Sequence, residues 1–135
     1  MLAQVMQKSP LNRASQLRSA LRGLNALSAD IEASAVISGD GLMLASMLDP
    51  HIDADRYAAM CASLLALAER AAQEVHRGRL KRVMIEGEHG TMLLVQAGCD
   101  GVLAVAARQT VNLGMVFLEA TKVAARIRGL LDQSP

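Results

Sequence analysis

Aromatic residues are almost absent from this sequence, which has one tyrosine, one phenylalanine and no tryptophan among 135 residues. Proteins that bind single-stranded nucleic acid stack bases on aromatic rings, and many ligand pockets are lined by them, so both kinds of site are disfavoured. The two cysteines have no second cysteine or histidine at ligand spacing, and therefore indicate neither a disulfide framework nor a zinc site. The 14 basic and 13 acidic side chains leave a net charge of +1, which excludes a generalised polyanion binder.

Long hydrophobic runs are also missing. The longest apolar stretch extends from Tyr57 to Ala68, whereas a membrane span needs about 20 residues. The first ten residues are too polar for a secretory signal, so we expect a cytoplasmic protein without membrane insertion. With 52% apolar residues, the chain can bury the core of one domain, which we place at residues 10–131 between tails at 1–9 and 132–135.

Three segments have the periodicity of helices. The first follows Ser9-Pro10, a capping hydroxyl and a proline suited to the first turn, and runs to about residue 28. The second begins after Asp53 and runs to about residue 77, where Gly78 is expected to supply a left-handed stop. The third follows Asn112 and keeps a helical period of apolar residues to about residue 131.

Five short apolar segments between turn residues are typical of strands. Two of them, 32–38 and 42–45, flank Asp40-Gly41, where we expect a tight hairpin with positive φ at both central positions. The other three, 80–86, 91–97 and 102–107, are separated by glycine-containing turns. The order α-β-β-α-β-β-β-α predicts an α+β sandwich. In it, a five-stranded antiparallel sheet carries the long second helix on one face and the other two helices on the opposite face.

The sequence contains no recognisable catalytic arrangement. It has no nucleophile elbow, phosphate loop or dinucleotide fingerprint, and its three histidines lie apart without a second ligand at helical spacing. We therefore expect neither an enzyme nor a bound metal or cofactor. The only polar cluster near a strand end that would support an enzyme is Arg108 with Cys99 and Asp100.

The second helix carries the strongest functional signal. From Tyr57 to Ala68 it contains no charged residue, so every side of the helix is apolar for more than three turns. A helix that covers one face of a sheet has an outer side open to water, and an apolar outer side needs a partner. We therefore predict an intermolecular interface that includes the larger side chains of this stretch: Tyr57, Met60, Cys61, Leu64, Leu65 and Leu67.

The third strand is expected at a sheet edge because it follows the crossover helix. Basic side chains gather at residues 77–82, and charge on an edge strand either prevents aggregation or sets the register of pairing with a second copy. If two copies pair about a two-fold axis at Met84, Arg82 lies opposite Glu86. Without aromatic residues or a recognition motif, the cluster does not indicate nucleic-acid binding.

The chain resembles the roadblock/dynein light chain family in its order of elements, its Val36–Ala45 hairpin, its alanine-rich second helix and its Gly101–Val105 strand. The resemblance covers about residues 10–131, and the excess of arginine over lysine and the standalone domain look like the bacterial branch. It implies a homodimer in which the third strands join into one sheet and the second helices are adjacent. It also implies binding of a Ras-like small GTPase, with bacterial members resembling a GTPase-activating partner that repositions the GTPase's own residues.

Two functions remain open on this basis. The first is a non-catalytic homodimer that regulates or scaffolds a Ras-like small GTPase, with the second helix and the residues before it as the contact surface. The second is a small-ligand-sensing signalling domain. A sensor needs a pocket between the sheet and its helices, whereas a regulator needs an apolar surface that the chain does not cover itself.

Overall fold

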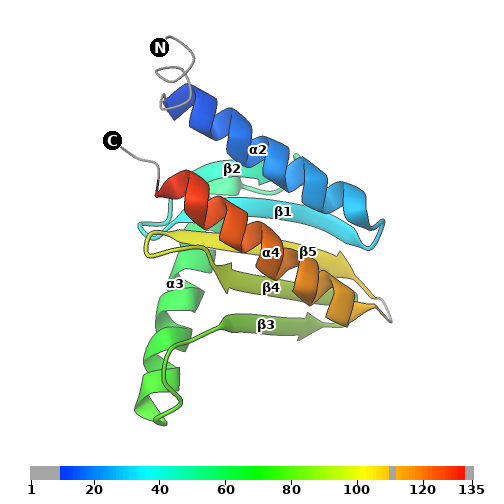
Figure 1. Ribbon diagram of the computed structural model, residues 1–135. Coiled ribbons are helices and arrows are strands. Elements are labelled where there is room, and N and C mark those ends of the chain that lie inside the picture. The colour runs from blue at the N-terminus through cyan, green and yellow to red at the C-terminus, as the bar shows by residue number, and fades with distance from the viewer. Residues whose placement is uncertain (1–9, 110–111, 133–135) are drawn as a thin grey trace.

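The computed structural model describes residues 10–109 and 112–132, which form three helices and five strands in the predicted order (Figure 1). The helices are α2 (Pro10–Leu27), α3 (Ala54–Glu74) and α4 (Leu113–Leu131). The strands are β1 (Ile31–Ser38), β2 (Met43–Met47), β3 (Arg82–Gly87), β4 (Gly90–Gln96) and β5 (Gly101–Arg108). The predicted Ser9 cap and most of both predicted tails lie outside the described residues.

All five strands pair antiparallel in one sheet, in the order β2-β1-β5-β4-β3. The last strand of the chain, β5, lies at the centre and pairs with both β1 and β4, so it joins the first hairpin to the second. The edges are β2 and β3. The predicted edge position of β3 is therefore confirmed.

Helices cover both faces of the sheet, as predicted. α3 contacts β1, β2, β4 and β5 on one face, while α2 and α4 contact each other on the opposite face (Figure 1). Successive side chains of a strand point to opposite faces, so a strand between two helical layers is apolar throughout. In β5, Leu103 and Val105 point toward α2 and α4, whereas Val102 and Ala104 point toward α3.

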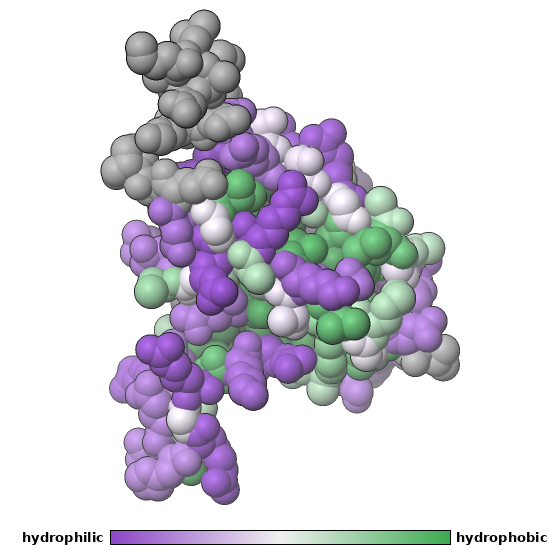
Figure 2. Space-filling model, viewed as in Figure 1, coloured by the Kyte–Doolittle hydropathy of each residue, from purple (hydrophilic) through white to green (hydrophobic). Residues whose placement is uncertain are grey.

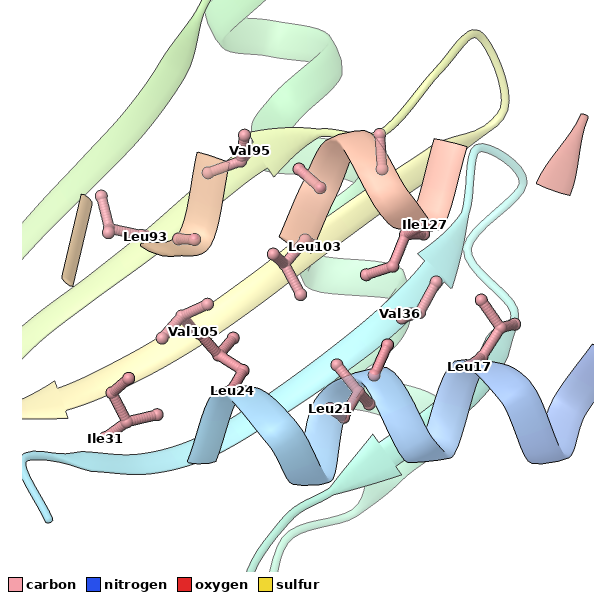
Figure 3. Packing of buried hydrophobic residues seen from close by; sticks show 14 of the residues in the cluster. Leu17, Leu21, Leu24, Ile31, Val36, Leu93, Val95, Leu103, Val105 and Ile127 are labelled. Atoms are coloured by element: carbon pink, nitrogen blue, oxygen red, sulfur yellow. The ribbon is translucent and has the colours of Figure 1, made fainter. Parts of the chain in front are cut away.

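The core between the sheet and the α2/α4 layer is the larger of the two. In Figure 3, Leu17, Leu21 and Leu24 of α2 lie over the strands that carry Val36 and Leu103. These leucines recur at steps of four and three residues and thus share one face of the helix. Burying each leucine contributes about 1.5–3 kcal/mol, so this stripe holds α2 on the sheet.

The turn between β1 and β2 differs from the prediction. It is a three-residue loop in which Gly41 alone has a positive φ, at 87°, while Asp40 does not. The Gly41 amide donates to the Ser38 carbonyl at 2.9 Å, and the Ser38 amide donates to the Leu42 carbonyl at 2.9 Å. This is the pattern of a three-residue hairpin with a bulge at Gly41. A second irregularity follows in the ladder, where the pairing of Ile37 with Met43 and of Val36 with Ala45 skips Leu44.

The ends of α3 are defined by local hydrogen bonds. At its start the Asp53 carboxylate accepts from the Arg56 amide at 3.1 Å, which confirms the predicted cap. Gly78 is left-handed as predicted, with φ at 79°, but it does not stop the helix, which ends at Glu74 where His76 takes the left-handed conformation with φ at 58°. The His76 amide donates to the Gln73 carbonyl and the Arg77 amide to the Ala72 carbonyl, which closes the helix in a Schellman motif.

Candidate interaction surface on α3 and β3

The carboxyl-terminal part of α3 projects beyond the edge of the sheet. Its 21 residues give a length of about 31 Å, whereas five strands span about 24 Å. In Figure 1 the end of α3 extends past β3, the edge strand. The three buried residues of the helix are Ala58, Cys61 and Leu65, and no residue from Ala66 to Glu74 is buried. The rest of its own chain therefore covers this segment less completely than it covers the first half of the helix.

An exposed apolar stripe runs along one flank of α3. Met60, Leu64 and Leu67 retain 51%, 39% and 62% of their accessible surface. They follow at steps of four and three residues, and the small, exposed Ala71 continues the series by another four. Alternating steps of four and three are the spacing at which two helices pack in a coiled-coil seam. We call Met60, Leu64, Leu67 and Ala71 the α3 seam.

Two residues of the predicted interface belong to the chain's own core instead. Cys61 is fully buried and Leu65 retains 8% of its surface, and both pack against the sheet beside Ile37 and Leu94. Their inclusion was wrong because an all-round apolar helix carries no periodicity that shows which side faces the sheet. Tyr57 is half-buried and packs at the border of the same core.

The Tyr57 hydroxyl and the Cys61 thiol of α3 are held in their neutral forms. Burial raises the pKa of the Cys61 thiol. Burial, the nearby Cys61 and a hydrogen bond between the two side chains also raise the pKa of Tyr57. Neither group is therefore activated as a nucleophile or base, because each would need to lose its proton more readily than usual.

The edge strand β3 exposes apolar side chains on both faces of the sheet. Met84 lies opposite Leu93, whose side chain packs in the α2/α4 core, while Ile85 lies opposite Met92 on the α3 side. Met84 and Ile85 are both exposed. Apolar side chains are thus exposed on both faces of the sheet at this edge, and this exposure favours pairing with a strand of another chain.

Arg82 and Glu86 share the α2/α4 side of the sheet with Met84, because they alternate with it along β3. The Arg82 guanidinium lies 5.5 Å from the centre of the Phe117 ring of α4. This cation–π contact was not predicted, since the sequence does not show which helix covers β3. It fixes the position of one of the basic residues near the sheet edge.

Two further exposed apolar residues lie near the start of α3. Leu42 belongs to the β1–β2 loop, and Gly41 beside it packs closely against Ala59 of α3. Ile52 precedes the helix and is also exposed. Sequence reasoning named the residues before the second helix only in general, and it singled out neither of these side chains, because a single exposed apolar residue is not by itself a signal.

The structure does not support the polar cluster considered for an enzyme. Cys99 and Asp100 precede β5, whereas Arg108 is its last residue, so about 23 Å of strand separates them. Arg108 instead forms an exposed ion pair with Glu32 at 3.9 Å. Within residues 10–109 and 112–132, no group of three or more His, Cys, Asp or Glu residues is arranged to hold a metal ion. No helix in the same ranges is both long and apolar enough to cross a membrane.

The sequence is similar to those of known proteins of one domain family. The family model of the Roadblock/LC7 domain matches residues 19–107, from the middle of α2 through nearly all of β5. The uncharacterized protein MJ1340 of Methanocaldococcus jannaschii is 40% identical over 100 residues, which are 74% of this chain and 87% of that protein.

Two solved structures share the fold. A Roadblock/LC7 domain from Streptomyces avermitilis has a TM-score of 0.77 at 24% identity, covering 84% of this chain and 96% of that one. Myxococcus xanthus MglB has a TM-score of 0.80 at 18% identity, covering 88% of this chain and 90% of that one. The structures are bacterial while the 40% identical relative is archaeal, so membership in a bacterial branch stays a prediction.

The burial of Cys61 can be tested by thiol labelling of the native protein. We expect Cys99, which is exposed, to react rapidly with a disulfide reagent, and Cys61 to react after unfolding. Cys99→Ser should therefore abolish the rapid phase. A rapid phase that persists in this variant would show that Cys61 is accessible and that α3 does not sit on the sheet as described.

Proposed function

Because the chain belongs to the Roadblock/LC7 family, we propose that it is a non-catalytic homodimeric regulator or scaffold that binds a Ras-like small GTPase. The observation that carries the self-association is the α3 seam, together with the part of α3 that projects past the β3 edge. The proposal that the partner is a GTPase rests on the family resemblance. This protein would act on the bound GTPase by repositioning the GTPase's own residues, as the resemblance to GTPase-activating partners implies.

The projecting end of α3 supports a dimer built around the β3 edge. In a two-fold assembly, each projecting helix end lies over the sheet of the second copy, and the two helices run antiparallel. The stretch from Met60 to Leu67 of one copy then faces the same stretch of the other in the opposite direction, so that Met60 lies toward Leu67 of the second copy. Removing these side chains from water stabilises the pair at about 25 cal/mol for each Å² of apolar surface buried.

The side chains of β3 support one register for this pairing. Residues directly opposite each other in an antiparallel pair lie on the same face, so a two-fold at Met84 keeps each core continuous across the edge. Arg82 then lies opposite Glu86 of the second copy on the α2/α4 side. Val83, already packed against the α3-side core, lies opposite Ile85. Each cross-strand charge pair contributes about 0.2–1 kcal/mol.

The start of α3 is the surface that we assign to the GTPase. The seam occupies the middle of the helix and extends into its projecting half, whereas Leu42 and Ile52 border its first turns. Exposed apolar residues on loops beside a rigid helix are a common basis for protein recognition. Under this assignment, self-association and GTPase binding use different parts of α3, so both can occur together.

The α3 seam predicts that Leu64→Asp disrupts self-association. An unpaired carboxylate in the apolar seam is costly to bury, and a two-fold dimer contains it twice, so we expect the dimer Kd to rise at least about tenfold. Sedimentation velocity over a concentration series measures this change. The matched control is Arg18→Asp on the exposed side of α2, which should leave the dimer intact. Equal sedimentation of the two variants would remove the seam from the interface.

The register predicts a charge-reversal rescue on β3. Arg82→Glu places two like charges opposite each other on both sides of the two-fold axis and should weaken the dimer about fivefold or more. Adding Glu86→Arg restores opposite charges and should recover most of the affinity. The readout is again the dimer Kd, with thermal unfolding of both variants as a check of the fold. A double variant that is as weak as Arg82→Glu alone would exclude this register.

The GTPase proposal is tested with a Ras-like GTPase from the same genome, loaded with GTP or with GDP. We expect the protein to bind one nucleotide state at least about tenfold more tightly, since the switch regions of such GTPases are ordered by the γ-phosphate. Leu42→Asp should weaken this binding while leaving the dimer intact, and Leu27→Asp on α2 serves as an exposed apolar control. A dimer that binds neither state would contradict the GTPase assignment without affecting the self-association.

A further inference from the structure

A basic groove lies between the start of β3 and the carboxyl-terminal half of α4. Its volume is about 630 Å³. Arg79, Lys81 and Arg82 line it from the side of β3, and Arg128 lines it from the side of α4 together with the small residues Ala124 and Ala125. In Figure 2 hydrophilic side chains gather in this region, beside the projecting end of α3. We refer to this feature as the basic groove.

The positive charge of the basic groove is not neutralised within the chain. Four cationic side chains line it against two carboxylates, Glu69 and Asp132. Among the described residues, none of the four cations forms an ion pair within the chain, and Arg82 contacts the ring of Phe117. In the proposed dimer Arg82 also lies opposite Glu86 of the second copy, which leaves Arg79, Lys81 and Arg128 as the cations available to a further partner. The protein as a whole carries a net charge of +1, so the groove is a local concentration of charge rather than a general property of the surface. Such a concentration favours an anionic occupant.

The shape and chemistry of the groove indicate an extended peptide. No aromatic side chain is among the residues that line the groove, so it offers no surface for stacking a base, and the nearby Phe117 ring is already in contact with Arg82. The small side chains of Ala124 and Ala125 leave room for a backbone, while cations from the β3 side and from α4 can meet carboxylates that point to both sides. Arginine pairs with carboxylates through two parallel hydrogen bonds.

We propose that the basic groove binds an extended acidic segment, rich in aspartate or glutamate, of a protein partner. The groove is lined mainly by residues at the start of β3, at the end of β4 and in α4, and Glu69 is its one lining residue from α3. An acidic segment there would leave the start of α3 free. The protein could therefore hold two partners at once, which does not depend on the identity of the partner at α3.

The test uses a fluorescein-labelled peptide of alternating glutamate and serine, with a glutamine–serine peptide as the uncharged comparison. We expect fluorescence polarisation to detect binding of the glutamate peptide to the full-length wild-type protein at about 50 mM salt. The affinity should fall several-fold at about 300 mM salt, because exposed charges are screened. The double variant Lys81→Gln/Arg128→Gln, which removes one cation from the β3 side and one from α4, should weaken binding about fivefold or more.

The matched control is Arg18→Gln/Arg22→Gln, which removes the same charge from the exposed surface of α2 and should change the affinity less than about twofold. Equal weakening by the two double variants would mean non-specific charge attraction and would overturn the proposal. So would a wild-type protein that does not distinguish the glutamate peptide from the glutamine peptide. Tighter peptide binding by Glu88→Gln would identify the acidic β3–β4 turn of a second copy as the occupant, and would also overturn it.

Discussion

Two apolar faces on one sheet are the constraint on which this structure depends. The central strands β1 and β5 bury side chains on both sides, so each face needs a helical layer. On one side two helices share that task, and α2 and α4 together cover the sheet. On the other side α3 lies alone, with Ala58, Cys61 and Leu65 as its buried residues. The second face is therefore covered much less completely than the first.

The exposed surface follows from this asymmetry. A helix of about 31 Å is longer than the width of a five-stranded sheet, so α3 extends past the edge strand and carries apolar side chains beyond it. This edge strand, β3, has no neighbour on its outer side among the described residues. An uncovered strand edge and an uncovered helix flank on the same side of the molecule are satisfied together by a second copy. Because one second copy covers both surfaces, we favour self-association over a separate partner for each surface.

The interior offers little support for a ligand sensor. The layers on both sides of the sheet are filled with aliphatic side chains such as Leu21, Leu94 and Leu103. The basic groove lies between the start of β3 and α4, but it is at the end of the sheet and is lined by four cationic side chains, outside the aliphatic core. The surfaces that we propose for binding are therefore the apolar α3 seam and the charged groove.

The sequence by itself determined the kind, number and order of the elements, because apolar periodicity and turn residues act locally along the chain. It also indicated the family and the edge position of β3. Tertiary structure decided which side of α3 meets the sheet, since a helix that is apolar all round does not specify its own rotation. That choice moved Cys61 and Leu65 into the core and left Met60, Leu64 and Leu67 outside. It likewise placed Arg82 on Phe117 and brought Arg128 opposite the start of β3, because contacts between distant segments exist only once the layers have packed.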